Sequence, residues 1–299
     1  MAIITTGTNP KMLWPGINAI FGSAYAEHAP EYKDLVDIFT SARAYEEDLQ
    51  VDRFGLAVIK PEAQAISFDT EKQGYVSRYV HVVYGLGYIV TREEQEDNLY
   101  MDKARPRTRS LAFSMHQTKE IVVANLYNRA TNSSYTFGDG VTMLSASHPT
   151  NAGNQANVLA ASADFSQAAL EDFMILISRT KDGRGLYIPN NAKTLVIPPD
   201  LMWEANRVLG SILQSNTAEN AINVVRNLLD IKVNRYLTDT NAFFIRTDMN
   251  DSLKLFQRRP LEFTQDNDWH TENHLYKATE RYSVGMSDWR GIFGSPGAS

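Results

Sequence analysis

The chain has 299 residues, of which 43% are hydrophobic and 21% charged, and it contains no cysteine. This composition excludes a wholly disordered chain, and the length suffices for one large or two medium domains. The lack of cysteine excludes a disulfide framework, a thiolate zinc site, an iron–sulfur cluster and a cysteine nucleophile. Lys and Arg number 29 against 35 Asp and Glu, and the net charge of −6 argues against non-specific nucleic-acid binding as the main activity.

No stretch approaches the roughly 18 consecutive apolar residues that a membrane-spanning helix needs. The N-terminus also lacks a basic segment followed by a continuous apolar core, so we find no secretion signal. We therefore expect a soluble protein of the cytosol, with no membrane partner and without metal or redox chemistry.

The first 30 residues predict an arm that contains a short helix. Pro15 suits a first helical position, and apolar residues follow at helical spacing up to Tyr25. Ala29-Pro30 then ends the pattern, because a residue before proline disfavours the α region. Such a helix docks either on its own core or on a neighbouring subunit, and the sequence leaves both open.

Residues 48–90 predict an extended β-hairpin. Phe54, Leu56 and Val58 alternate with polar or small residues, and residues 79–84 alternate again. The connection at 60–74 is mostly polar. Because a two-stranded ribbon is marginally stable alone, we expect this hairpin to rest on something else.

A helix of unusual length follows. Thr91 to Glu94 matches a capping box and predicts a short helix to about residue 101. Pro106 then predicts the start of a second helix that runs to about residue 131 without an internal glycine or proline, roughly 38 Å at 1.5 Å per residue. Its apolar stripe includes Leu111 and Met115, and we expect Lys119 among the charged residues on its other sides.

The remaining chain alternates helices and strands and then becomes mostly strand. We expect a loop region over 132–157 with a short strand near 141–144, and a helix capped by Ser166. A strand at 193–197 and helices at 201–213 and 216–229 follow, the last with Ile222, Val225 and Leu229 inward. Strands are predicted at 242–247, 253–257 and 274–286.

The histidines and acidic residues do not form a convincing metal site. His270 and His274 have ligand-like spacing, but the glutamate between them is displaced from the position that a metalloprotease helix requires. The segment Asp266 to Asp268 resembles half a calcium loop without its glycine and distal glutamate. We predict no metal ligands and no bound metal.

Phosphate-binding and nucleophilic motifs are equally incomplete. The glycine pairs at 85/87 and 138/140 lack the third glycine and the strand-to-helix setting of a dinucleotide fingerprint, and a turn after a helix explains Gly183 and Gly185. Ser145, His148 and Asp139 lie close in sequence, but no Gly-x-Ser-x-Gly elbow is present, so a loop explains them better than a triad. The acidic pairs 46/47 and 93/94 suit helix-terminal or solvent-facing positions better than a catalytic couple. The basic pair 258/259 could contact phosphate, but salt bridges within an acidic protein explain it better. We predict no catalytic residues, no cofactor-binding residues, no cofactor and no enzymatic activity.

The order of arm, hairpin, long helix, α/β block and final strands resembles the major capsid protein of tailed bacteriophages, with its Hong Kong 97-like fold. Four segments carry the resemblance: 79–94, 111–120, 140–149 and, most specifically, the closing stretch 280–297 with its Asp-Trp-Arg-Gly-Ile-Phe-Gly-Ser-Pro-Gly. They span most of the chain. The resemblance implies an α+β fold with an N-terminal arm at 1–47, an E-loop hairpin at 48–90, a P-domain at 91–149 whose spine helix covers about 106–131, an A-domain at 150–235, and P-domain strands with the C-terminus at 236–299.

The resemblance also implies a function and partners. Copies would form hexameric and pentameric capsomers and tile an icosahedral shell around double-stranded DNA, which they would contact only non-specifically. The protein would belong to the virion and assemble in the host bacterial cytoplasm, with a portal and, in some heads, decoration or cement proteins. The arm and the E-loop would lie across neighbouring subunits.

Two features of the family are expected to differ here. The chain starts only a few residues before the arm, so a separate scaffolding protein is the better expectation than a cleaved leading segment. Lys60 and Lys72 lie in or near the hairpin, but nothing singles out either as a cross-linker, and we predict no cross-link. An encapsulin-type nanocompartment subunit is the main alternative, and a hydrolase with an unrecognised site is a weaker one.

Overall fold

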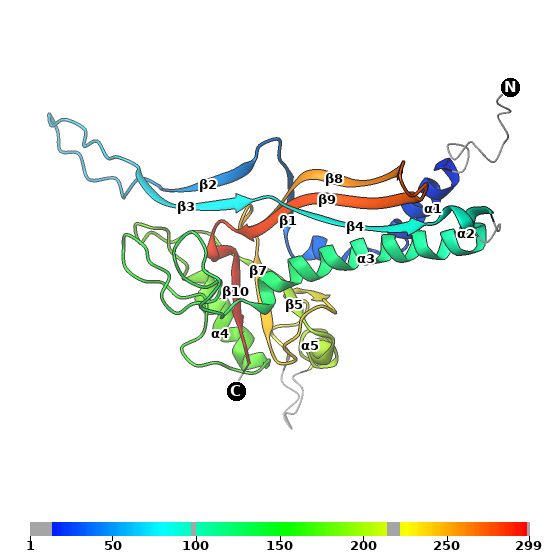
Figure 1. The fold of residues 1–299 in the computed structure, drawn as a ribbon. Coiled ribbons are helices and arrows are strands. Elements are labelled where there is room, and N and C mark those ends of the chain that lie inside the picture. Colours follow the sequence, from blue (N-terminus) through cyan, green and yellow to red (C-terminus); the bar gives the residue numbers. More distant parts are fainter. Residues whose placement is uncertain (1–13, 97–99, 214–221, 298–299) are drawn as a thin grey trace.

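A computed structural model describes residues 14–96, 100–213 and 222–297 of the chain. Its shape is elongated: a long sheet lies over a long helix, a hairpin projects from one end of this layer, and a second lobe lies below the half next to the hairpin (Figure 1). The first thirteen residues of the expected arm lie outside the described residues. The helix predicted near Pro15 is present as α1, Trp14–Ala26.

The upper sheet has the strand order β1-β8-β9-β4. Its strands are β1 (Asp37–Thr40), β4 (Val82–Val90), β8 (Leu253–Asn267) and β9 (His274–Met286). β1 pairs parallel with β8, and the other pairs are antiparallel. The prediction for β9 is confirmed at both ends. The prediction that the preceding strand ends at 257 is wrong, since β8 continues for ten more residues to Asn267, with two irregularities in its pairing between Gln257 and Glu262.

The helix below this sheet is α3, Tyr100–Asn128 (Figure 1). The prediction that Pro106 begins the helix is wrong, since Pro106 lies inside it, and the helix ends three residues before the predicted 131. A proline near the first turns removes one backbone hydrogen bond without ending the helix, which is why the local signal misplaced the boundary. Leu111, Ala112 and Met115 pack with Phe21 of α1 and Ala278 of β9 in a small core.

The second lobe contains the larger core and a mixed sheet of order β10-β7-β5-β6. These strands are β5 (Ala192–Ile197), β6 (Asp230–Val233), β7 (Phe243–Thr247) and β10 (Ile292–Ser295), and the helices beside them are α4 (Gln167–Ser178) and α5 (Met202–Gly210). β7 and β10 come from the final segment, yet they complete the sheet that β5 and β6 begin. The expected boundary at residue 235 therefore does not coincide with a division between sheets.

The projecting hairpin is built from β2 (Tyr45–Asp52) and β3 (Lys72–Val80), paired antiparallel. The predicted strand at Phe54 to Val58 is wrong for the isolated subunit, because residues 53–71 form no ladder and extend as an open loop. Alternation alone could not show this, since a strand also needs a partner strand. After one residue, β4 leaves the hairpin and joins β9 in the upper sheet.

Four other predictions need correction or confirmation. Residues 141–144 form no strand, and the described part of the predicted helix 216–229 consists of turns, with Ile222 exposed rather than inward. Residues 216–221 of that helix lie outside the described residues. The start of the short helix after Thr91 is confirmed by α2, Arg92–Glu96, and the Glu94 N–H donates to Thr91 Oγ1 over 3.3 Å. Residues 97–99 of that predicted helix lie outside the described residues, and residues 100 and 101 belong to α3. Ser166 caps α4 as predicted, its Oγ accepting from the Ala169 N–H.

Candidate assembly surfaces

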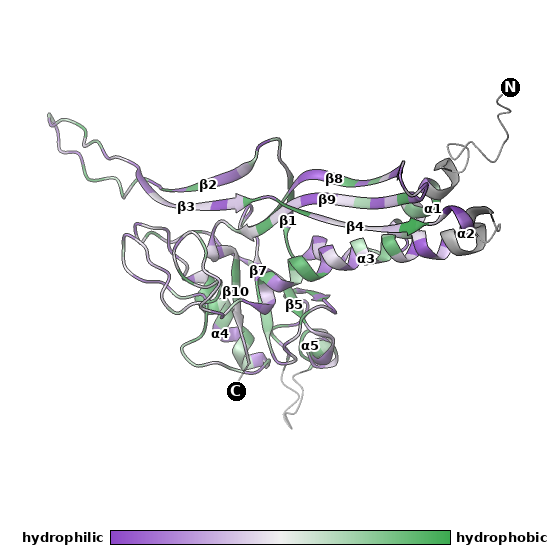
Figure 2. Cartoon of the chain, viewed as in Figure 1, coloured by the Kyte–Doolittle hydropathy of each residue, from purple (hydrophilic) through white to green (hydrophobic). Residues whose placement is uncertain are grey.

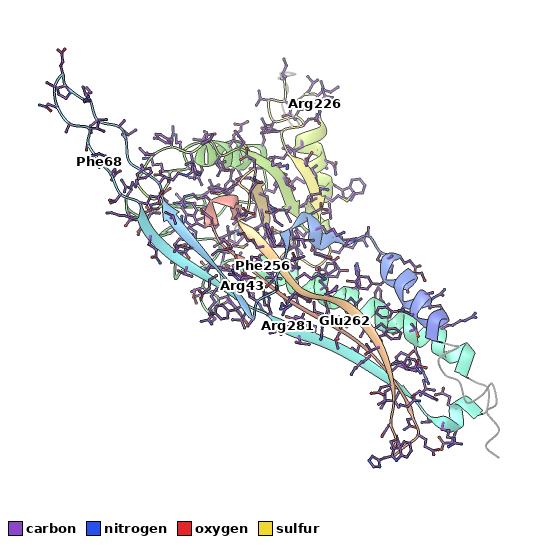
Figure 3. All side chains as sticks on the ribbon, turned by 90° about the horizontal axis from the view of Figure 1, so that it is seen from above. Arg43, Phe68, Arg226, Phe256, Glu262 and Arg281 are labelled. Atoms are coloured by element: carbon purple, nitrogen blue, oxygen red, sulfur yellow. The ribbon has the colours of Figure 1, made fainter. Side chains whose placement is uncertain are left out.

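The end of the hairpin, residues 53–71, carries apolar side chains that the subunit does not bury. Ile59 and Phe68 are each 93% exposed. The others on this hairpin tip are Phe54, Leu56, Val58 and Ile66, all more than half exposed. Figure 2 shows hydrophobic and hydrophilic positions interspersed along the tip, and Figure 3 shows Phe68 on the projecting loop, outside the body of the molecule. An apolar group of this size on a projecting loop is typical of a surface that another molecule covers.

One ionic contact holds the hairpin tip to the second lobe. The carboxylate of Asp69 accepts from the Gly55 N–H at 2.8 Å and lies 2.5 Å from Arg184 Nη1. Hydrogen bonds from the backbone N–H groups of Gly55 and Thr70, and then from Arg184, lower the pKa of Asp69. The contact ties both sides of the loop to residues 182–186.

The root of the hairpin rests on the upper sheet through a polar cluster. Asp48 Oδ2 on β2 lies 2.7 Å from Lys254 Nζ on β8 and accepts from Ser287 Oγ over 2.5 Å. Tyr79 Oη on β3 is also 2.5 Å from that serine oxygen, and burial raises the pKa of Tyr79. These contacts fix where the hairpin leaves the body.

A buried ion pair joins α3 to the upper sheet. Lys119 Nζ lies 2.5 Å from Glu280 Oε1 on β9, and the two residues are 2% and 1% exposed. The Gln257 amide also donates to Glu280 over 3.1 Å. The expectation that Lys119 decorates an outer side of the helix is therefore wrong. The sequence did contain one sign that Lys119 is buried, because it lies between Met115 and Val122 of the apolar stripe. Helix periodicity alone could not assign Lys119 to the buried side of the helix.

The next residue of α3 holds the arm. Glu120 is fully buried, and its Oε1 accepts from the Glu31 N–H at 2.9 Å, where the arm enters the body through the 3₁₀ helix Glu31–Asp34. Burial raises the pKa of Glu120 from 4.5 to about 7. His116 Nε2 lies 3.7 Å from Glu120 Oε1, and burial together with the nearby His28 lowers the pKa of His116. The arm is thus attached through a carboxyl group that titrates near neutral pH.

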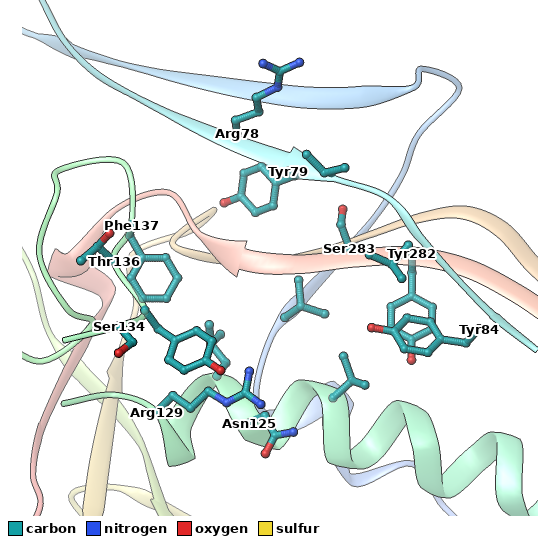
Figure 4. Close-up of a pocket in the computed structure, with 16 residues that line it drawn as sticks. Arg78, Tyr79, Tyr84, Asn125, Arg129, Ser134, Thr136, Phe137, Tyr282 and Ser283 are labelled. Carbon is teal, nitrogen blue, oxygen red and sulfur yellow. The ribbon is translucent and has the colours of Figure 1, made fainter. Parts of the chain in front are cut away.

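A pocket of about 420 Å³ opens between the hairpin root, the end of α3 and the loop at 134–137 (Figure 4). Its apolar walls include Tyr84 and Tyr282, whose rings stack 4.7 Å apart. Two guanidinium groups line it, those of Arg78 and Arg129. We call this the root pocket. No carboxylate belongs to its lining.

The structure brings two of the three nucleophile candidates together, but not the third. His148 Nδ1 lies 2.6 Å from Asp139 Oδ2, with both side chains buried, and the imidazole stacks on Trp289. The backbone N–H of Ser147 donates to Ser145 Oγ, and within the described ranges no hydrogen bond joins this oxygen to His148. A triad needs that bond, so this arrangement serves loop structure. That the protein has no catalytic residue stays a prediction.

The other sequence candidates are dispersed. His274 Nδ1 lies 2.7 Å from Asn267 Oδ1, the His270 N–H donates to Asp268, and no group of three potential metal ligands occurs among the described residues. Gly87 lies in β4, where a Cβ would come within 2.6 Å of the Tyr276 carbonyl oxygen, so close strand packing explains this glycine.

The paired charged residues lie on strands and helix ends. Glu47 is 3.6 Å from Arg78, and Arg259 is 3.6 Å from Glu262 on the same strand. Glu94 Oε2 accepts from Arg107 over 2.8 Å. The ion pairing predicted for the basic pair is therefore confirmed for Arg259. Glu94 lies in the first turn of α2, as a helix-terminal residue would, whereas Glu47 is exposed on strand β2 and not at a helix end. Within the described part of the chain, no helix combines the length and the apolar character that a bilayer span requires.

Comparisons with known proteins agree with this geometry. The profile of a family described as phage capsid protein matches residues 74–294. No curated protein matches the sequence. Among solved structures, the capsid of a native gene transfer agent particle matches with a TM-score of 0.57 at 10% identity, covering 91% of each chain.

Two further structures show the same likeness. The procapsid of bacteriophage JBD30 matches with a TM-score of 0.52 at 14% identity, over 98% of this chain and 76% of that one. A virus-like particle from Pyrococcus furiosus matches with a TM-score of 0.50 at 11% identity, over 93% of this chain and 97% of that one. At these identities the likeness establishes the fold, which is the Hong Kong 97-like fold expected from the sequence.

Proposed function

The chain belongs to the phage capsid protein family, and from this premise we propose that its copies form hexamers and pentamers that close into an icosahedral shell around double-stranded DNA. In this assignment residues 1–47 are the arm, 48–90 the E-loop, 91–149 the P-domain with α3 as its spine, 150–235 the A-domain, and 236–299 the returning strands and C-terminus. The protein is a structural component of the virion. Assembly in the host cytoplasm and the absence of any catalytic activity belong to the proposal.

The observation that carries the proposal is the hairpin tip. Six apolar side chains on a loop without strand pairing cannot be buried by the subunit itself, and two of them are 93% exposed. An isolated subunit would gain no stability from such a loop. In a shell, the same loop adds contact area between copies without enlarging the hydrophobic core of each subunit. The many identical copies in a shell are the partners that cover it.

The proposed partners beyond the copies themselves follow from the same role. A separate scaffolding protein would guide assembly, a portal would occupy one vertex, and decoration or cement proteins would bind the outside. A net charge of −6 suits a wall that encloses DNA and contacts it only non-specifically. We propose that the contacts between subunits are non-covalent, with no lysine cross-link.

An encapsulin-type nanocompartment is the second candidate. The likeness to the virus-like particle from Pyrococcus furiosus, which extends over 97% of that chain, supports this candidate. The contents of the particle separate the two functions. Nuclease-protected viral DNA inside purified particles would support the phage head, and an enclosed protein without DNA would support the nanocompartment.

The assembly proposal is tested by expressing the chain and examining it by negative-stain microscopy and sedimentation velocity. We expect shells, tubes or capsomers. The double variant Leu56→Ser/Phe68→Ser should lower their yield while leaving the unfolding midpoint of the subunit unchanged, because both side chains are exposed in the subunit. A protein that stays monomeric with and without scaffolding protein and at every salt concentration would overturn the proposal.

A further inference from the structure

We propose that the face of the upper sheet turned away from α3 carries a binding site for a phosphate group. The site lies on three neighbouring strands, where Arg259 of β8 and Arg281 of β9 run beside the glycine-containing strand β4. All of its residues belong to one subunit, so the site goes beyond the proposed function and exists whether or not the copies form a shell.

The pairing of β8 with β9 sets two arginines directly opposite each other, since Arg259 is the ladder partner of Arg281. Side chains alternate along a strand, and Ala278 and Glu280 of β9 face α3, so Arg281 lies on the other face. Figure 3 looks down on the sheet from above and shows Arg281 and Glu262 along it. Like charges directly opposite each other destabilise an antiparallel pair, and an anion between the two guanidinium groups would remove this cost.

The two guanidinium groups are not fully satisfied by the subunit. Within the described ranges, Arg281 forms no ion pair, and its Nε is buried without a hydrogen-bond partner. Arg259 Nη2 donates to Thr279 Oγ1 over 3.0 Å, while its buried Nε lies 3.6 Å from a carboxylate oxygen of Glu262 and also lacks a hydrogen-bond partner. Glu262 is thus the one ion-pair partner of the two arginines among the described residues.

The surroundings of the pair are also positively charged. Arg258, which precedes Arg259 in β8, is exposed and has no ion-pair partner in the described part of the chain. Burial and then the charges of Arg281 and Arg258 lower the pKa of the nearby His81, against an opposing effect of Glu46. In a chain with a net charge of −6, this part of the sheet is a local region of positive potential.

Strand β4 leaves this face open next to the arginine pair. Gly85 is the ladder partner of Thr279, and Gly87 is that of the exposed Lys277. A Cβ at Gly85 would come within 3.0 Å of Thr279 Cγ2, so the glycine keeps the space beside Thr279 free of a side chain from β4. A ligand can therefore approach the Thr279 hydroxyl from solvent.

A phosphate group suits this arrangement better than a carboxylate does. Its oxygens point in tetrahedral directions, so different oxygens can accept from Arg259, from Arg281 and from the Thr279 hydroxyl, whose own oxygen already accepts from Arg259. Guanidinium groups bind phosphate through two parallel hydrogen bonds, which adds both strength and orientation. The negative charge of the ligand would offset the repulsion between the two strands.

Thermal unfolding of the full-length chain, purified as dissociated subunits, tests the site. Inorganic phosphate is added while sodium chloride keeps the ionic strength constant. At about ten times the dissociation constant, a single site should raise the midpoint by about 3 °C. Acetate at the same concentration should give less than half of this shift, and an equal shift from acetate would overturn the assignment to phosphate.

Variants separate this site from general effects, because phosphate also stabilises folded proteins by exclusion from their surface. Arg281→Gln should lose most of the midpoint shift. Arg109→Gln, at an exposed position of α3 below the sheet, is the matched control and should keep the full shift. Equal shifts in Arg281→Gln and the wild type would overturn the inference.

Equilibrium dialysis with radiolabelled phosphate measures binding directly and does not depend on the folding of any variant. We expect saturable binding of a single phosphate per wild-type subunit. Gly85→Val keeps every charge but fills the space beside Thr279, and it should lose most of the bound phosphate. The absence of saturable binding to the wild type would overturn the inference and leave the assembly proposal standing.

A second arm of the dialysis identifies the source of the phosphate group. A short DNA duplex is added at an equal concentration of phosphate groups. Displacement of the labelled phosphate would show that the site takes the phosphodiesters of a nucleic acid, whereas full retention would show that it takes the free ion. Either result supports a phosphate site at Arg259 and Arg281.

Discussion

Replacing Lys119 by methionine should destabilise the subunit strongly, because the change leaves Glu280 as a buried carboxylate without its cation. The nitrogen and oxygen are 2.5 Å apart, and neither residue is more than 2% exposed. Coulomb attraction at this separation is about 7 kcal/mol at an effective dielectric constant of about 20. Removing the lysine also removes its own desolvation cost, so the net loss should be about 3–5 kcal/mol, as for other broken buried pairs.

The loss is measured as the free energy of unfolding of dissociated subunits in urea, followed by tryptophan fluorescence. Lys119→Met/Glu280→Met removes both charges and should recover most of the loss, because a buried pair and an apolar replacement are nearly equal in stability. Lys277→Met, at an exposed position of β9, is the control and should stay within about 0.5 kcal/mol of the wild type. A cost below about 1 kcal/mol for Lys119→Met, or a double variant as unstable as the sum of its single variants, would refute the reasoning.

Three further predictions concern the arm, the hairpin and α4. The pKa of Glu120 in the folded protein is raised from 4.5 to about 7, so its contribution to stability is present below pH 4.5 and is lost as the pH rises to 7. Glu120→Gln should therefore flatten the dependence of the thermal unfolding midpoint on pH between 4.5 and 7. A pH dependence parallel to that of the wild type would contradict this. Gly183→Ala would place a methyl group against the buried carboxylate of Asp52. Hydrogen exchange of the backbone amides in β2 and β3 should therefore accelerate, while that of β9 stays slow. Unchanged exchange rates in the hairpin would count against a fixed hairpin root. Ser166→Ala removes the cap of α4 and should lower the free energy of unfolding in urea by about 1 kcal/mol. Ser178→Ala, at the exposed end of the same helix, should lower it by less than half of that. Equal losses from the two variants would exclude capping as the cause.

Local signals determined much of the architecture. The Thr91 capping box, the Ser166 cap and the alternation of β9 all depend on residues within a few positions of one another, and each was placed correctly from the sequence. The length of α3 was also foreseen, although its start was not. The resemblance in the closing stretch supplied the fold and the family, which residue patterns alone would not have done.

Partners distant in the sequence decided the rest. Phe54 to Val58 has the pattern of a strand but finds no partner within the subunit, so it remains an exposed loop. β7 joins the sheet of the second lobe because β5 and β10 flank it, and neither strand is close to it in the sequence.

The buried polar residues show the same difference between what local sequence determines and what distant partners determine. The sequence by itself determined elements such as α4 and β9, because backbone preference and apolar periodicity act over a few residues. It did not determine that Lys119 meets Glu280, or that Glu120 meets the arm at Glu31, since these pairs are separated by 161 and 89 positions. Only the tertiary structure brings such groups together, because burying a charge is tolerated where the fold delivers its partner and excludes water from both.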